Sequence, residues 1–389
     1  MTNRIYYLAY FNDPEITKEE RYVSRAATTK VEYIASCLNA VGFGVEIVSL
    51  AEGSSNRCYP ARVVNLRQGL SLKLFRSFGH NSIIGKILNR FIVRNQLSAF
   101  LKGLGSDDVV ICYHSVDYIE TLIEFKNKRQ FKLILEVEEV YSDVSHSVEL
   151  KKREHRIFNA ADAFLFPTEL LAKSIGLRSR PFCVCSGIYS VNRQVSDKRN
   201  DGRTHVVYAG TLDPRKGGAA AAAAAGFFLD SRYAMHILGS GTERQILDIE
   251  SAVDKANKAG HGCAISYDGF LSGREFDEFI QSCHIGLSPQ NPNEPFNQTS
   301  FPSKVFMYLS NGLQVVSVDL PVFTGDLRQQ LFLCHSNDGI DLAKQICAAG
   351  DKLSAAQPAV DFLKKENDIF CNELLKLVET INAPKRHAS

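Results

Sequence analysis

Short apolar runs of strand character alternate with segments of helical periodicity, and this alternation limits the fold more than any other feature of the sequence. In the N-terminal half, strands are predicted at "RIYYLAYF", "VEIVSL", "DDVVICYH", "KLILEVE", "ADAFLFPT" and "RPFCVCSG". Amphipathic segments such as "SRAATTKVEYIASCLNAVG" and "SVDYIETLIEFKN" separate some of them. Apolar strands that alternate with such helices are typical of a parallel sheet covered by helices on both faces.

The alternation starts a second time after a polar, charged stretch with little periodicity. A chain of 389 residues is too long for one ordinary core. We therefore predict an α/β protein with two Rossmann-like, doubly wound domains. The first spans residues 1–187, a linker spans 188–204, and the second spans 205–358. A long charged amphipathic helix is predicted at 359–381.

Composition excludes several classes of protein. The net charge of +2 gives no indication of nucleic-acid binding. The ten cysteines include no CxxC pair and no spacing typical of zinc, so reduced thiols in a cytoplasmic protein are expected. The first residues lead directly into a strand, so we expect no signal peptide. No apolar run approaches the ~20 residues needed to span a bilayer.

Ligands of doubly wound domains bind beyond the carboxyl ends of the strands, and the cleft between two such domains is the default site. Four loops of the second domain are expected at this edge. Their sequences are "GTLDPRKGG", "GSGT" (Gly239 to Thr242), "DGFLSG" (Asp268 to Gly273) and "NQTSFPSK".

The fourth loop has the chemistry of an anion site. It precedes an apolar helix, whose N-terminus presents unpaired N–H groups and a partial positive charge. Ser300 and Ser303 add hydroxyl groups and Lys304 adds a full charge, with Lys216 and Arg215 approaching from the first loop. These groups suit a diphosphate. The alternative is that Ser303 only caps the helix and Lys304 is solvated.

Four segments in this order resemble the donor-binding domain of retaining GT-B glycosyltransferases, of the bacterial "glycosyl transferases group 1" type. They are "YAGTLDPRKGG", "ILGSGTE", "YDGFLSGREFDEFIQSCHIGLSP" and "FPSKVFMYLSNGLQVVS". The resemblance covers about Val206 to Ser317. It implies a nucleotide-sugar donor, UDP- or GDP-linked, bound by the second domain and an acceptor bound by the first. It also implies a tail helix that packs back on the first domain.

The resemblance also suggests donor-binding residues, and this chain departs from the pattern at several of them. The lysine that contacts the donor diphosphate falls on Lys216, but Thr211 replaces the usual arginine. Two family glutamates fall on Thr299 and Met307, so ribose binding must differ. Phe270 and Leu271 match the segment that reads the base, and Gly239 and Gly241 form the second loop.

The glycine loop that the family carries after its first strand is absent. The segment "YFNDPEITKEERYVSR" replaces it, and within it we expect Asn12, Arg21 and Arg25 to bind the acceptor.

Two polar segments follow strands of the first domain and supply candidate catalytic residues. Buried unpaired carboxylates are costly, so Glu138 or Glu139 is predicted to face the cleft and orient the acceptor hydroxyl or the sugar. The alternative is that these carboxylates cap a helix or pair with Arg21, Arg25 or Lys30. His114 is a further candidate, although a histidine at a strand end is more often structural.

No Asp-x-Asp motif occurs, so we expect no metal site and no cofactor beyond the donor itself. The related retaining enzymes are generally metal-independent. In the expected mechanism, the departing phosphate takes the proton of the acceptor hydroxyl.

The span between Glu52 and Asp107 lacks acidic residues but carries many basic ones, from Arg57 to Lys102, interleaved with apolar residues. Such segments bind anionic membrane surfaces. The alternative is an ordinary helix with a basic outer face.

Together these features predict a glycosyltransferase that builds a surface polysaccharide (O-antigen or capsule) on a glycan or polyprenol-linked acceptor. We expect it to be cytoplasmic and peripheral on the inner face of the cell membrane. The main alternative is a catalytically silent GT-B module that binds another glycosyltransferase. An NAD enzyme is disfavoured because no G-x-G-x-x-G follows the first strand. A nucleotide-sugar epimerase with the same fold stays open.

Overall fold

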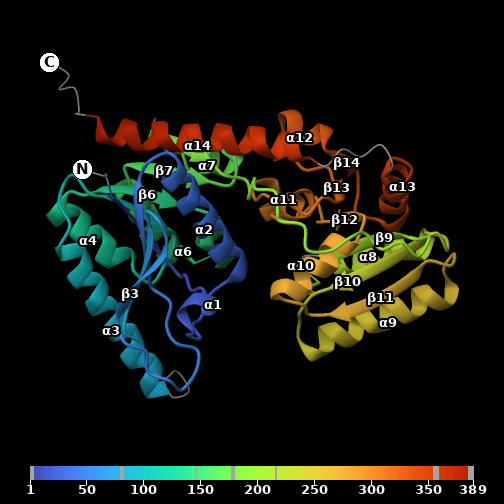
Figure 1. Ribbon diagram of the computed structural model, residues 1–389, viewed down its shortest axis with the longest axis horizontal. Helices are drawn as coiled ribbons and strands as arrows, with labels where there is room; N and C mark the ends of the chain where they lie inside the picture. The colour runs from blue at the N-terminus through green and yellow to red at the C-terminus, as the bar shows by residue number, and fades with distance from the viewer. Residues whose placement is uncertain are drawn as a thin grey trace. The chain divides into compact units, whose positions relative to one another are not determined.

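The chain forms two compact α/β units in the computed structural model, which describes residues 4–78, 83–145, 147–176, 180–214, 217–353 and 359–383 (Figure 1). Unit 1 comprises Met1–Cys185 and Asp368–Ser389, and unit 2 comprises Ser186–Asn367. Of the predicted linker 188–204, residues 188–203 have no regular secondary structure and Thr204 begins a strand; the whole segment belongs to unit 2.

The sheet of unit 1 has the strand order β3-β4-β2-β1-β5-β6-β7-β8. All neighbouring strands are parallel except β3 and β4, which form an antiparallel hairpin at one edge. The sequence did not reveal this hairpin, because the side chains of β3 are mostly exposed and carry no apolar alternation. The strand bounds are β1 Arg4–Ala9, β2 Gly44–Ser49, β3 Arg62–Arg67, β4 Leu70–Leu74, β5 Val109–Tyr113, β6 Lys132–Glu136, β7 Ala163–Phe166 and β8 Phe182–Val184.

Helices cover both faces of this sheet, with α3 and α4 on one side and α2 on the other (Figure 1). Apolar residues of α3, α4, α6 and α7 share one core with the strands. On the opposite face, Tyr33 of α2 stacks on Phe370 of α14 with ring centroids 5.7 Å apart. The helix bounds are α1 Pro14–Thr17, α2 Arg25–Ala40, α3 Ile83–Lys102, α4 Ile119–Arg129, α5 Tyr141–Ser145, α6 Val148–Ala160, α7 Glu169–Ile175 and α14 Val360–Asn382.

The sheet of unit 2 is entirely parallel among the strands that the structure describes, with the order β11-β10-β9-β12-β13-β14. The chain leaves the central strand β9 toward β10 and returns on the other side at β12, so the strand order reverses there. Ligands of open parallel sheets bind at such a switch point. The bounds are β9 Thr204–Ala209, β10 Tyr233–Leu238, β11 Ala264–Gly269, β12 Ile285–Ser288, β13 Gln314–Val318 and β14 Leu331–Cys334.

Small residues let one helix of unit 2 pack close to its sheet. The alanine-rich α8 buries Ala222 and Ala225 completely, and a β-carbon at Gly226 would lie 2.7 Å from Ile265. Helices α8, α9 and α13 share one core with the strands. The helix bounds are α8 Gly218–Phe228, α9 Glu243–Ala259, α10 Gly273–Ser282, α11 Lys304–Ser310, α12 Gly325–Gln329 and α13 Gly339–Gly350, with a 3₁₀ turn at Pro295–Gln298. Among the described helices of both units, none is long and apolar enough to cross a membrane.

Candidate active site

Backbone hydrogen bonds join the loops at the carboxyl ends of the unit 2 strands. The amide of Leu212 donates to the carbonyl of Ser240 (3.1 Å), and the amide of Gly239 donates to the carbonyl of Gly269 (2.9 Å). The hydroxyl of Tyr267 donates to the carbonyl of Gly239 (2.9 Å). The loops after β9 and β10 and the end of β11 therefore form one connected edge.

The two predicted donor-loop glycines are required by this packing. A β-carbon at Gly239 would lie 1.8 Å from the carbonyl oxygen of Gly210. One at Gly241 would lie 2.7 Å from the side-chain oxygen of Gln245 and 2.9 Å from the β-carbon of Leu212. Packing alone explains both glycines, and their contact with a donor stays a prediction.

Lys304, the first residue of α11, places its ammonium group at this same edge. Its Nζ lies 5.5 Å from the centroid of the Tyr208 ring, which suits a cation–π contact. A β-carbon built at Gly210 would lie 2.8 Å from that Nζ. The half-buried lysine therefore lies against the backbone at the end of β9, next to the switch point of the sheet.

The other predicted residues of this loop lie just before α11. Ser303 occupies the N-cap position with φ −53° and ψ −23°, and its side chain makes no capping hydrogen bond. The alternative role of Ser303 as a side-chain cap is therefore not supported. Its side chain is exposed, and Thr299 and Ser300 are half-buried.

The first loop is described only in part. Thr211 is exposed, and its carbonyl accepts a hydrogen bond from the Tyr208 hydroxyl (2.9 Å). Arg215 and Lys216, the predicted diphosphate contacts, lie outside the described residues. The chain resumes at Gly217, the N-cap of α8, with φ 68°, a conformation that favours glycine.

The predicted base-reading segment follows β11 directly. The Phe270 side chain is 67% exposed, and Leu271 is half-buried. An exposed aromatic ring beside the loops after β9 and β10 offers a flat apolar surface to a ligand.

Asp268, two residues before Phe270, ends a polar cluster on the opposite face of the sheet from the α8–α9–α13 core. Its carboxylate lies 3.1 Å from Nδ1 of His236, and Nε2 of that ring lies 2.9 Å from Nδ1 of His205. Nδ1 of His284 accepts a hydrogen bond from the backbone amide of His205 (3.0 Å). Burial, followed by the charge of Lys198, lowers the pKa of His284 to about 4, so this imidazole is neutral near pH 7.

At the carboxyl edge of unit 1, a buried carboxyl group ends β6. Oε2 of Glu136 accepts a hydrogen bond from the Tyr7 hydroxyl (2.5 Å), and Oε1 has no hydrogen-bond partner among the described residues. Burial and the neighbouring charge of Glu138 raise the pKa of Glu136 to about 8, against the opposing effects of Lys30 and Tyr7. The group is therefore mostly protonated at neutral pH.

The two predicted catalytic carboxylates lie in different surroundings. Oε1 of Glu138 pairs with Nζ of Lys30 (2.6 Å), and that ammonium also donates to the carbonyl of Cys185 (2.8 Å). Glu138 thus makes the ion pair with Lys30 that was the structural alternative. Glu139 is exposed, so an orienting role stays a prediction for this residue.

His114 lies in a buried network instead of on an open surface. The side chain is 2% exposed, and its Nε2 lies 2.8 Å from Oε1 of Glu154. The Glu154 carboxylate also accepts the backbone amides of Tyr141 and Ser142 (both 2.9 Å) at the start of α5. Although burial raises the pKa of Glu154, the bonds from His114 and Ser142 lower it overall. The geometry favours the structural role for His114.

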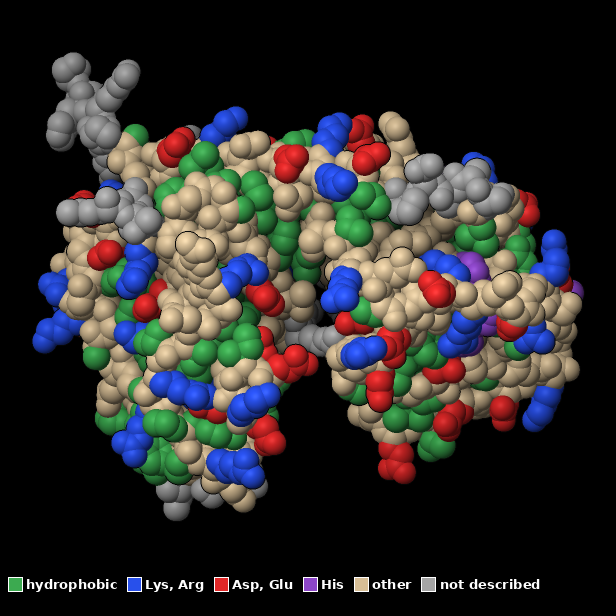
Figure 2. Space-filling view, in the orientation of Figure 1, with side chains coloured by type: hydrophobic (Ala, Val, Ile, Leu, Met, Phe, Trp, Pro, Cys, Tyr) green, Lys and Arg blue, Asp and Glu red, His purple; other side chains and the backbone are tan. Residues whose placement is uncertain are grey.

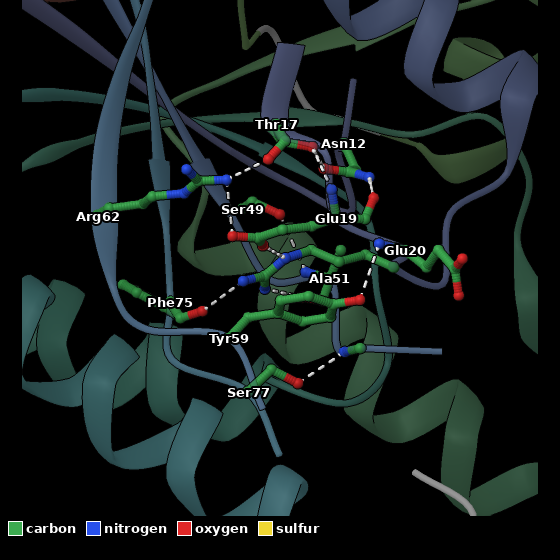
Figure 3. A network of polar contacts seen from close by, with 12 residues as sticks. Asn12, Thr17, Glu19, Glu20, Ser49, Ala51, Tyr59, Arg62, Phe75 and Ser77 are labelled. Atoms are coloured by element: carbon green, nitrogen blue, oxygen red, sulfur yellow. Dashed lines mark hydrogen bonds and ion pairs between the residues drawn. The ribbon is translucent and has the colours of Figure 1, made fainter. Parts of the chain in front are cut away.

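Asn12 and Arg21, predicted to bind the acceptor, belong to a network that fixes the segment after β1 (Figure 3). Nδ2 of Asn12 donates to the carbonyl of Glu19 (2.8 Å). The guanidinium of Arg21 donates to the carboxylate of Glu19 (2.7 Å) and to the carbonyls of Ala51 (2.6 Å) and Phe75 (2.9 Å). Both side chains are buried, so they hold this segment in place. Arg25 begins α2, and its side chain lies outside the described residues.

A pocket of about 420 Å³ opens beside this segment, at the carboxyl ends of β1 and β5. Its volume is in the usual range for small-molecule sites. The sequence did not identify its walls, although Tyr113 is the last residue of β5 and Tyr10 directly follows β1. The lining includes Ala9, Tyr10, Tyr22, Ser24, Tyr113 and Tyr141.

A second pocket of about 480 Å³ shares Tyr10 and Tyr22 with the first. Arg90 and Asp117 form an ion pair there (3.0 Å). Burial raises the pKa of Glu52, which also lines it, and Arg90 acts against this effect. Its remaining lining residues are Ile87 and Tyr118.

Within the described ranges, no group of three or more His, Cys, Asp or Glu side chains is arranged to hold a metal ion.

Solved structures share the fold of the whole chain. An E. coli structure of trehalose-6-phosphate bound with UDP-2-fluoro glucose superposes with a TM-score of 0.66, at 11% identity, over 98% of this chain and 99% of the other. Sucrose-phosphate synthase from Thermosynechococcus elongatus gives 0.61, at 12% identity, over 98% and 96%. Anabaena Alr3699/HepE in complex with UDP and glucose gives 0.60, at 11% identity, over 99% and 100%.

No family model matches the chain, and no curated protein matches it in sequence. The chain has two Rossmann-like units in tandem, one with an eight-stranded sheet and one with a six-stranded parallel sheet. This architecture and the similarity to these solved structures show that the chain has the GT-B fold. The resemblance indicated by the motifs of unit 2 is thus confirmed at the level of fold, at low sequence identity.

Proposed function

We propose that the chain is a glycosyltransferase that moves a sugar from a nucleoside-diphosphate donor to a glycan or lipid-linked acceptor during surface polysaccharide synthesis. The observation that carries the proposal is the position of Lys304, whose ammonium lies at the end of β9 against Gly210. A cation at the switch point of a parallel sheet suits a diphosphate. The E. coli and Anabaena neighbours hold UDP-2-fluoro glucose and UDP with glucose, so UDP-linked donors come first and GDP-linked donors second.

The proposed chemistry proceeds with retention and without a metal ion. The bond between the anomeric carbon and the diphosphate oxygen breaks while the acceptor hydroxyl attacks the same face of the sugar. The departing phosphate takes the hydroxyl proton. Lys304 and the predicted Lys216 offset the charge that develops on the diphosphate, and such stabilisation is usually the largest single contribution to catalysis. Glu139 is the exposed carboxylate proposed to orient the acceptor.

A panel of nucleotide sugars tests the proposal. We expect at least one UDP- or GDP-sugar to be hydrolysed slowly without acceptor, and Lys304→Ala to reduce this rate by about 100-fold or more. Lys352→Ala is a matched control, because Nζ of Lys352 also lies 5.5 Å from an aromatic centroid, that of Phe332. The carbonyl oxygen of Lys352 accepts a hydrogen bond from the side chain of Gln314, the first residue of β13. Lys352 therefore lies at the amino end of the strands, away from the end where Lys304 lies. Equal rates for the two variants would contradict the role of Lys304.

A second candidate is a catalytically silent GT-B module that binds another glycosyltransferase. It is favoured by Thr211 and Met307, which replace an arginine and a glutamate of the family pattern. Nucleotide-sugar hydrolysis by the purified chain decides between the two functions. If the full panel yields no hydrolysis, the silent module is the better account.

We also propose that unit 1 rests on an anionic membrane surface on the cytoplasmic side. Over the region of α3, basic and hydrophobic side chains lie next to one another (Figure 2). Phe91 is 62% and Leu88 45% exposed, and Arg94 is exposed on the same helix. Apolar side chains beside arginine are typical of interfacial helices. Flotation with vesicles that contain anionic lipid is expected, and Phe91→Ser with Arg94→Glu should abolish it. Flotation that does not depend on anionic lipid would exclude this contact.

A further inference from the structure

The two pockets of unit 1 are adjacent, because the same two side chains line both of them. Tyr10 and Tyr22 border the pocket of about 420 Å³ at the ends of β1 and β5, and also the pocket of about 480 Å³ beside α3. A ligand that fills one pocket therefore meets the boundary of the other.

This boundary is held in place without a ligand. The Tyr10 hydroxyl donates to Oδ2 of Asp117 (3.1 Å) and lies 3.3 Å from Oγ of Ser115. Its ring stacks on Tyr118 with centroids 6.4 Å apart. Groups that are ordered before binding lose less entropy when a ligand arrives.

Tyr22 presents its ring from an anchored backbone. Its amide donates to the carbonyl of Glu52 (2.8 Å), and the preceding Arg21 is fixed by three buried hydrogen-bond acceptors. The side chain itself is 52% exposed. The buried network of Figure 3 thus positions an exposed aromatic ring, which gives Arg21 a positioning role.

The chemistry of the walls suits sugar rings in both pockets. In the first, tyrosine rings offer flat apolar faces and their hydroxyls offer hydrogen bonds. In the second, Tyr118 and Ile87 lie beside the Arg90–Asp117 ion pair and Glu52. Sugar hydroxyls can donate to these carboxylates and accept from the guanidinium. An alkyl chain would instead remove these charged groups from water without replacing their hydrogen bonds, which is costly.

We propose that the two pockets are adjacent subsites for one acceptor that contains at least two sugar units. The acceptor sugar and its neighbour occupy one pocket each, and Tyr10 and Tyr22 separate them. This inference rests on the proposed function and narrows its acceptor to an oligosaccharide, as opposed to a single sugar, a sugar phosphate or an alkyl glycoside.

Binding of the full-length protein to mono- to tetrasaccharides on a glycan array, followed by calorimetry, tests the inference. We expect at least one disaccharide to bind ten times more tightly than either of its monosaccharides, glucose 6-phosphate or octyl glucoside. Arg90→Ala should weaken that binding about fivefold, and Tyr22→Ala should abolish it. Arg156→Ala is the matched control, because Arg156 is an exposed arginine of the same unit that also forms an ion pair, with Glu120 (2.9 Å), and does not line either pocket. This variant should bind as the wild type does.

Three results would overturn the inference. The first is that a single sugar, a sugar phosphate or an alkyl glycoside binds as tightly as any disaccharide. The second is that Arg90→Ala and Arg156→Ala weaken binding equally. The third is that no glycan binds. Nucleotide-sugar hydrolysis in the same preparation keeps this test separate from the proposed function. An absence of hydrolysis would contradict the proposed donor site in unit 2. The glycan-binding measurements contain no donor, so they test only the pockets of unit 1.

Discussion

The carboxyl ends of the strands are built differently in the two units. In unit 1, ionisable side chains at the ends of β5 and β6 engage other protein groups beside the tyrosine-lined pocket, as in the pairs Glu138–Lys30 and His114–Glu154. In unit 2, loops meet through backbone bonds at glycines, and the ammonium of Lys304 lies against them. Polar residues at a strand end therefore do not by themselves mark a binding site. What matters is whether protein groups already satisfy them.

The largest expected effect concerns close backbone packing in unit 2. Gly239→Ala places a β-carbon 1.8 Å from the Gly210 carbonyl oxygen, so the backbone must shift, at a cost of about 3 kcal/mol in the free energy of unfolding. Gly44→Ala in unit 1 is the control. A β-carbon there meets nothing within 4 Å, so stability should change by less than about 1 kcal/mol. Urea denaturation measures the free energy of unfolding of both variants. Equal losses of stability in Gly239→Ala and Gly44→Ala would contradict the proposed difference in packing.

The buried carboxyl group of unit 1 predicts a pH dependence. Its pKa of about 8 in the folded protein exceeds the usual 4.5, so the folded state binds a proton that the unfolded state has released. This contribution is complete below pH 4.5 and is lost as the pH rises through 8. Glu136→Gln, which stays neutral, should flatten the stability profile between pH 5 and 8. An unchanged profile would show that Glu136 is ionised.

The pairing of Glu138 gives a smaller, local prediction. Glu138→Gln leaves the Lys30 ammonium, whose side chain is 11% exposed, without its carboxylate, and should destabilise the protein by about 2 kcal/mol. The exposed Glu139 is the matched position, and Glu139→Gln should leave the melting temperature unchanged while it slows transfer. If Glu139→Gln destabilises as much as Glu138→Gln, the two carboxylates do not have separate roles.

The histidine cluster of unit 2 predicts a pH dependence of opposite sign. The pKa of His284 is lowered to about 4 in the folded protein. Between pH 6.5 and 4, this imidazole is therefore mostly protonated in the unfolded state and mostly neutral in the folded state. Stability should therefore fall as the pH drops through this range. Since the side chain is half-buried, we expect about 1 kcal/mol after solvent screening. His284→Asn should remove this component in melts at pH 5 and 7, whereas retention of the full slope would assign it to another group.

The strands that carry the two sites were predictable because each is apolar on both faces and bounded by helical segments. The β3–β4 hairpin was not, since β3 lies exposed at the sheet edge. Its one local signal is Gly69, whose φ of 77° marks the turn between the two strands.

The position of Lys304 followed from local reasoning, because a residue that starts a helix after a strand end must lie near that end of the sheet. The pairing of Glu138 with Lys30 did not, because these residues are 108 positions apart and a single sequence carries no signal of such contacts. The tyrosine walls of the pockets were missed for the same reason, since Tyr10, Tyr22 and Tyr118 meet only in the folded unit.

Calorimetric titration of UDP and GDP into the wild type and Lys304→Ala tests most directly whether the edge of unit 2 binds a nucleoside diphosphate. We predict that one nucleotide binds and that Lys304→Ala weakens its affinity at least tenfold, which corresponds to about 1.4 kcal/mol or more. Lys352→Ala should bind as the wild type does. Equal affinities of Lys304→Ala and the wild type, or the absence of nucleotide binding, would contradict this account.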